Sequence, residues 1–111
     1  MKFLITSILV IGSLIITANS FYTPQLENTG KAVFEESCAS CHTGGFKAWL
    51  SGSPEIGDMN DWKSFFEKGL TEMTKNVFEG SKRHEAKGDC DECTEEQIKA
   101  AIEYIMAETS E

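Results

Sequence analysis

The last third of the chain has the clearest pattern of apolar and polar positions. Its apolar residues recur every three or four positions: Ile98, Ala101, Ile102 and Ile105. This spacing places them on one face of an α-helix. Thr94 precedes the run and Gln97 stands three positions later, which is the pattern of a capping box at a helix N-terminus. We therefore predict a terminal helix that begins after Thr94 and buries its isoleucine face.

A second helix is predicted over residues 30–37, because Asn28 or Thr29 can cap its N-terminus. Val33 and Phe34 supply its apolar contacts. We expect this helix to end in a loop that contains the first two cysteines of the chain.

Two further helices are predicted in the middle of the chain. Asn60 can cap a helix over residues 61–68, whose aromatic residues would be buried: Trp62, Phe65 and Phe66. A helix over residues 71–79 would end at Gly80. No segment alternates between apolar and polar residues as a half-buried strand does, so the predicted fold class is all-α.

The stretch between residues 44 and 57 is predicted to be mostly irregular, because it is interrupted by glycines and a proline. Within it, residues 46–50 can form one helical turn with Trp49 turned inward. Loops of this length are expected to wrap around a buried group.

The amino end resembles a secretory leader. Residues 1–20 contain one cation, Lys2, then a mostly apolar run, then small residues at the positions that a signal peptidase reads. The alternative is an uncleaved membrane anchor, although the apolar run is short for a bilayer span. We expect a leader over 1–20, an extended arm over 21–28 with Pro24, and one small domain over 29–111.

The net charge of -8 describes an acidic protein. This balance excludes nucleic acid as a partner and favours proteins with a basic docking face, although a solvated acidic surface explains it equally well. Export would place the four cysteines in an oxidising compartment, which we expect to be the periplasm. A domain this small also needs a stabilising group, such as a cofactor or a disulfide, in addition to its own hydrophobic core.

The run Cys38-Ala39-Ser40-Cys41-His42 is the signature of covalent haem attachment. Its two thiols can each bind a vinyl group of one porphyrin, and the adjacent imidazole can bind the iron. A redox dithiol and a chance loop are weaker readings. Half of a zinc site is excluded, because no second pair of ligands has a suitable spacing. The sequence therefore predicts one covalent haem c, which would also be the additional stabilising group that the domain needs.

Several segments around this motif resemble the class I c-type cytochromes. They are the run Gly30-Lys31-Ala32-Val33-Phe34, the run Pro54-Glu55-Ile56-Gly57-Asp58, and the terminal helix with Tyr104. The Cys90 and Cys93 pair before that helix is similar to the small bacterial cytochrome c-five group. The resemblance implies a cytochrome c fold, with roughly four to five short helices wrapped around the haem.

The resemblance also implies specific contacts. The first and last helices should cross at Gly30, with Phe34 near Tyr104. The carbonyl of Pro54 should accept a hydrogen bond from His42. Ile56 should pack on the haem, and Trp62 is expected in the wall of its pocket.

The sequence departs from the cytochrome c-five pattern at the sixth iron ligand. His84 stands where that group has a methionine, counted back from Cys90 without gaps. A pair of imidazoles from His42 and His84 would lower the reduction potential relative to a histidine and a methionine. The alternatives are an exposed His84 with Met59 or Met73 as the ligand, or an open sixth site.

Cys90 and Cys93 are expected to form a disulfide, from the oxidising compartment and the resemblance. A second haem is excluded because Thr94, rather than histidine, follows Cys93. A working dithiol remains the alternative, but no thioredoxin-like alternation of strands and helices surrounds the pair.

The sequence thus predicts a periplasmic monohaem cytochrome that carries single electrons between redox proteins, with no catalytic residue. Two alternatives stay open: a haem enzyme or gas-binding sensor with a vacant sixth site, and an electron-transfer subunit of a larger oxidoreductase. Membrane association is expected only if the leader is uncleaved.

Overall fold

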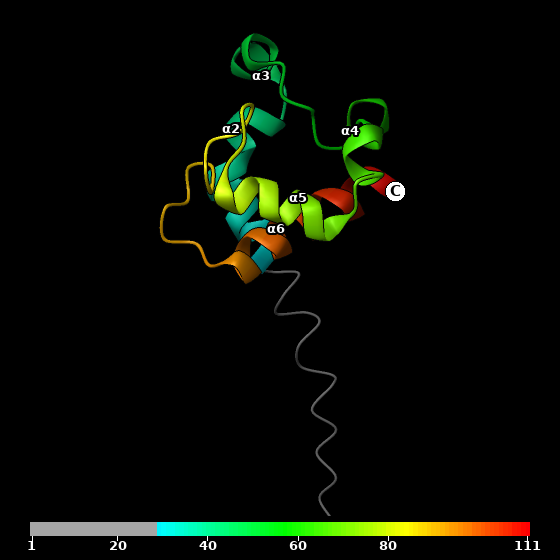
Figure 1. Cartoon of the computed structure of the whole chain (residues 1–111). Helices are drawn as coiled ribbons and strands as arrows, with labels where there is room; N and C mark the ends of the chain where they lie inside the picture. Colours follow the sequence, from blue (N-terminus) through cyan, green and yellow to red (C-terminus); the bar gives the residue numbers. More distant parts are fainter. Residues whose placement is uncertain (1–28) are drawn as a thin grey trace, which may run out of the picture.

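The computed structural model describes residues 29–111, which form a helical fold (Figure 1). The predicted leader and arm lie outside these residues. Residues 29–33 are helical, and the elements that follow are η2 (Phe34–Cys38), α2 (Ala39–His42), α3 (Gly45–Ser51), α4 (Met59–Phe66), α5 (Leu70–Glu79) and α6 (Glu95–Ser110). Residues 29–111 contain no strand, only an isolated bridge between Ser81 and His84. None of the helices described is long and apolar enough to cross a membrane.

The terminal helix, α6, is the centre of the core. It packs against η2, α4 and α5, and it buries the apolar face that the sequence predicts: Ile98, Ala101, Ile102 and Ile105. The predicted capping box is confirmed. The backbone N–H of Gln97 donates to Thr94 Oγ1 at 3.2 Å, and the backbone N–H of Thr94 donates to Gln97 Oε1 at 2.8 Å. Local sequence therefore sets where α6 begins, and its isoleucine face sets how it is buried.

We expect Thr94→Ala to lower the free energy of unfolding by about 1 kcal/mol, because the Gln97 amide loses its acceptor at the helix N-terminus. Guanidinium denaturation of the haem-bound protein measures this loss. Thr71→Ala, on the exposed surface of α5, is the matched control and should change stability by less than about 0.5 kcal/mol. Equal losses in the two variants would contradict a capping role for Thr94.

The first helix crosses α6 in close contact, as the resemblance implies. A Cβ atom at Gly30 would overlap the carbonyl group of Ala100 in α6, so the two backbones touch at this position. One turn later, Phe34 is buried, and its ring centroid lies 5.4 Å from that of Tyr104. Glycine is required at position 30 by this approach of two backbones.

The first helix does not end in a loop before the cysteines, so that prediction is wrong. It continues through η2 into α2, and the Ala39 amide donates to the Phe34 carbonyl five residues earlier. This is a π turn within a continuous helix. No glycine or proline occurs between residues 31 and 43, and nothing in that stretch therefore stops the helix.

The middle helices form close to their predicted positions. Helix α5 begins one residue earlier than expected and ends before Gly80 as predicted. Helix α4 is capped by Asp58 rather than Asn60, because the backbone of Asp58 is extended and its side chain accepts the Asn60 amide at 3.0 Å. It also ends at Phe66, two residues before the predicted end. Trp62 is buried as predicted, whereas Phe65 and Phe66 are only half-buried and pack against the core cluster.

The predicted helical turn after the cysteines is present as α3, but its orientation differs from the prediction. Trp49 is 76% exposed, whereas Ala48 on the same helix is buried. Among the elements described, α3 contacts only α2, and Figure 1 shows it apart from α5 and α6. The inward placement of Trp49 is wrong because no second element lies over that face of α3.

Candidate functional site

The two cysteines of the Cys38 to His42 motif lie on one continuous helix. Cys38 is the last residue of η2, and Cys41 and His42 belong to α2. Both thiols are free and half-buried. Burial, followed by the nearby Asp89 and Cys41, raises the pKa of the Cys38 thiol to about 11. The motif therefore places two free thiols and an imidazole within one helical segment.

His42 is held by the segment that follows α3. Its Nδ1 donates to the carbonyl oxygen of Pro54 at 2.8 Å, as the resemblance implies. The Ile56 amide donates to the His42 carbonyl at 2.7 Å. In the neutral imidazole, a proton on Nδ1 leaves the lone pair on Nε2. These contacts fix the tautomer and the direction in which Nε2 can bind a metal.

Trp62 supports the same segment. Its ring centroid lies 5.4 Å from that of His42, and its indole Nε1 donates to the Glu55 carbonyl at 2.8 Å. Ile56 is half-buried and packs against the core cluster. The Trp62 ring is therefore an aromatic neighbour of the His42 imidazole.

The protonation state of His42 depends on its burial and on its neighbours. Burial lowers the pKa of His42, the hydrogen bond to Pro54 acts in the opposite direction, and the charge of nearby His84 lowers it further. The net direction is downward from 6.5, so the imidazole is mainly neutral at pH 7. A neutral imidazole is the form that binds a metal.

His84 lies on the loop between α5 and α6. Ser81 and His84 exchange two backbone hydrogen bonds, of 2.8 and 3.3 Å, which close a tight turn. The Nδ1 atom of His84 donates to the Glu85 carbonyl at 2.7 Å. His84 therefore resembles His42 in one respect: a backbone carbonyl holds its Nδ1 and leaves Nε2 as the ligand atom.

The structure brings the two histidines together. Their ring centroids lie 6.3 Å apart and their planes differ by 13°. Two imidazoles that share one metal through Nε2, each nitrogen about 2 Å from it, have centroids roughly 6 Å apart. The donor set and its spacing therefore fit an iron between His42 and His84.

The two methionines considered as alternative ligands lie elsewhere. Met73 is 7% exposed and belongs to the buried core cluster with Trp62 and the isoleucines of α6. Met59 is the first residue of α4 and is 41% exposed. Within residues 29–111, no group of three or more His, Cys, Asp or Glu residues could hold a metal ion.

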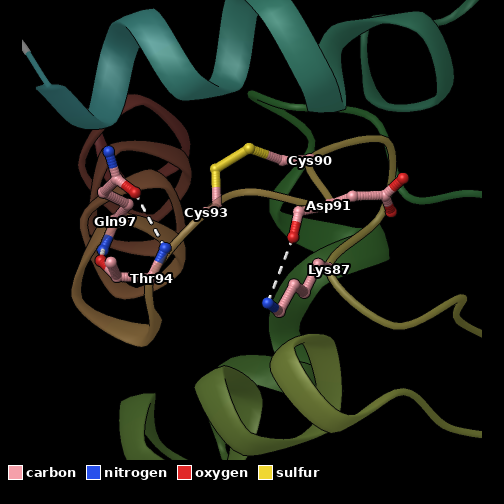
Figure 2. The surroundings of a disulfide bond; sticks show 6 residues. All are labelled: Lys87, Cys90, Asp91, Cys93, Thr94 and Gln97. Atoms are coloured by element: carbon pink, nitrogen blue, oxygen red, sulfur yellow. Dashed lines mark hydrogen bonds between the residues drawn. A yellow bond between two sulfur atoms is a disulfide. The ribbon is translucent and has the colours of Figure 1, made fainter.

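The loop that presents His84 is tied to the start of α6 by a disulfide between Cys90 and Cys93, with Cα atoms 5.4 Å apart (Figure 2). Cys93 is buried in the core cluster. A Cβ atom at Gly88 would lie 3.8 Å from His84 Cε1 and 3.9 Å from the Ser37 carbonyl, so this loop lies against the helix of the cysteine motif.

Lys87 also holds this loop in place, although no sequence pattern indicates such a role. Its amide donates to the Val77 carbonyl at 2.7 Å, and its Nζ lies 4.8 Å from the ring centroid of Phe78. The same Nζ donates to the Asp91 carbonyl at 3.3 Å (Figure 2). Its φ of 60° is the one left-handed value at a non-glycine residue in the described part of the chain. No sequence pattern predicts a left-handed backbone at this lysine.

Comparison with known proteins gives consistent matches. Residues 25–105 match the family described as "Cytochrome C oxidase, cbb3-type, subunit III". The chain is 34% identical to cytochrome c-555 of Prosthecochloris aestuarii, over 71% of this chain and 84% of the relative. It is 32% identical to cytochrome c-555 of Chlorobaculum thiosulfatiphilum, over 72% of this chain and 93% of the relative. Cytochrome c5 of Azotobacter vinelandii is 30% identical, over 67% of this chain and 87% of that protein. Since the family match spans the cysteine motif and most of α6, and the fold is that of a cytochrome c, the chain belongs to the small class I c-type cytochromes and binds haem c covalently.

Proposed function

We propose that this protein is a periplasmic one-electron carrier with a single haem, whose iron is bound by His42 and His84. The observation that supports this most directly is the geometry of the two imidazoles, 6.3 Å apart and nearly parallel. A carrier needs both axial positions filled in both oxidation states, because retained ligands keep the reorganisation on electron transfer small. The names of the relatives, cytochrome c-555 and cytochrome c5, agree with an electron carrier.

In this proposal, Cys38 and Cys41 hold the haem through thioether bonds, and the two histidines bind its iron through Nε2. The haem supplies a metal that gains and loses one electron. The carbonyls of Pro54 and Glu85 keep a proton on Nδ1 of each histidine. Hydrogen bonds of this kind make Nε2 a more basic ligand and fix the orientation of each ring.

The ligand pair also supports a low reduction potential. A thioether ligand favours ferrous iron, whereas a second imidazole does so less. The two alternative methionine ligands lie elsewhere in the fold: Met59 is at the start of α4, and Met73 is in the buried core. The proposed carrier therefore operates at a lower potential than a cytochrome with a histidine and a methionine.

Export is proposed from the sequence of residues 1–20, which resembles a secretory leader. Thioether bonds to haem and a disulfide between Cys90 and Cys93 both suit an oxidising compartment. The proposed partners are redox proteins with a basic docking face, because the chain has a net charge of -8.

The optical spectrum of the ferric haem-bound protein tests the ligand assignment. We expect a low-spin spectrum without the red band of a thioether bound to iron, and no change when carbon monoxide is added to the ferrous form. A high-spin spectrum with ready binding of carbon monoxide would instead favour a gas-binding sensor or a haem enzyme. The thioether band would show a methionine ligand and contradict the role of His84.

A second candidate is an electron-transfer subunit of a larger oxidoreductase. It is favoured by the description of the matching family, which is a subunit of an oxidase. The size of the native protein on purification distinguishes the two: a free carrier elutes as a small protein, and a subunit elutes with its complex.

A further inference from the structure

The apolar face of α3 points away from the protein. Three residues spaced by three and four positions form this face and are 75%, 76% and 64% exposed: Phe46, Trp49 and Leu50. The Phe46 and Trp49 ring centroids are 6.0 Å apart with an angle of 30° between the planes. A helix normally buries such a face, and exposed apolar patches mark sites of interaction.

A hollow of about 430 Å³ lies beside this face and shares Trp49 with it. Trp49 of α3 and Phe65 of α4 line it together with the carboxylates of Glu55 and Asp61. The Glu55 carboxylate lies close over the Gly44 turn, 3.0 Å from the position of a Cβ atom there. Asp61 Oδ2 accepts the Glu55 amide at 3.5 Å, so the two acidic residues belong to one connected rim.

This hollow is separate from the haem-binding groups but adjacent to them. The residues that line it include neither the two free cysteines nor either histidine. They do include Pro54, whose carbonyl accepts the hydrogen bond from His42. A molecule bound in the hollow therefore lies one hydrogen bond away from the proposed iron ligand.

The chemistry of the hollow fits a cationic side chain. Aromatic rings attract a guanidinium or ammonium group through their faces, and the two carboxylates add ionic attraction. Lys47, the one basic residue of α3, donates to Ser40 Oγ at 3.4 Å and is not among the residues that line the hollow. The net charge of -8 favours approach of the same kind of partner.

We propose that the outward face of α3 and this hollow form a docking site for a basic patch on a redox partner, with an arginine of that partner held between Trp49 and Phe65. The apolar residues Phe46 and Leu50 form the remainder of the contact surface. This proposal rests on the carrier function proposed above, and it identifies the surface that the partner uses.

A hexa-arginine peptide, titrated into the ¹⁵N-labelled ferrous haem-bound protein, tests the site. We expect amide shifts concentrated in α3 and residues 53–61, with an affinity that falls as salt is added. Trp49→Ser should weaken binding about two- to fivefold through loss of the cation–π contact. The double variant Glu55→Gln with Asp61→Asn should weaken it further and reduce the dependence on salt.

The matched control is Glu103→Gln, which removes an exposed charge from α6 and should leave the affinity unchanged. Shifts spread evenly over the acidic surface, or an equal loss of affinity in Glu103→Gln, would show nonspecific attraction and overturn the proposal. Absence of binding would overturn it as well. A dimer in sedimentation that Trp49→Ser dissociates would show that a second copy covers α3, and would also refute partner docking.

The two proposals can fail separately. The spectrum and reduction potential of Trp49→Ser should equal those of the unmodified protein, because the Trp49 side chain is 76% exposed and belongs to α3, which carries none of the proposed haem-binding residues. A high-spin spectrum of the unmodified protein would contradict the carrier function, whereas loss of peptide specificity with a normal low-spin spectrum would contradict the docking site alone.

Discussion

His84→Met is expected to raise the reduction potential of the haem by on the order of 0.1 V, within the roughly 0.8 V range that axial ligands can produce. The reason is the change of donor: a thioether stabilises ferrous iron relative to ferric iron, and an imidazole does so less. His84 lies on a turn closed by two backbone hydrogen bonds with Ser81, so a methionine at this position starts from the same backbone location. Potentiometric titration of the two proteins measures the difference.

Two controls make this result specific. Met59→Leu removes the exposed alternative ligand and should leave the potential unchanged. His84→Ala should yield a high-spin form that binds carbon monoxide, because the sixth position loses its protein ligand. An unchanged potential in His84→Met, together with a normal low-spin spectrum in His84→Ala, would show that another residue binds the iron.

Gly30→Ala is expected to lower the free energy of unfolding by about 3 kcal/mol, the upper part of the range for overpacked cores. A methyl group at this position overlaps the Ala100 carbonyl, so the first helix and α6 would have to separate. The intrinsic helix propensity acts in the opposite direction, since alanine favours a helix by about 1 kcal/mol over glycine. Guanidinium denaturation of the haem-bound protein therefore distinguishes the two effects by the sign of the change.

Gly52→Ala is the useful comparison, because its position has no neighbour within 4 Å but has a φ of 66°. Its cost should be about 1 kcal/mol, from the left-handed backbone alone. If Gly30→Ala were as stable as the unmodified protein or more so, the close contact of the two helices would be refuted.

Sequence patterns predicted the helices best where the determinants are local. The start and buried face of α6 follow from Thr94, Gln97 and the isoleucine spacing, all within a few residues. The start of α4 was missed because Asp58 and Asn60 are both good caps, and the choice depends on which backbone is extended. The exposure of Trp49 depends on which elements lie over α3, and this is a tertiary property.

The candidate site likewise contains some features that the sequence predicts and others that it does not. The cysteine motif and the histidine beside it can be identified from spacing, and the Pro54 contact came from resemblance to a family. Proximity of His84 to His42 was expected from one alignment position, and the structure places their rings 6.3 Å apart. The Glu85 carbonyl on His84 and the left-handed Lys87 could not be predicted, because both depend on the loop backbone rather than on residue type.

The π turn of η2 also affects how this chain is to be aligned with others. A π turn is equivalent to one residue inserted into an α-helix, and each residue of an α-helix turns the chain by about 100°. The π turn therefore changes the angle around the helix axis between Phe34, which packs on α6, and Cys38. The change corresponds to one residue relative to an unbroken α-helix. A homologous chain whose helix is α throughout would align with a one-residue gap between these two positions.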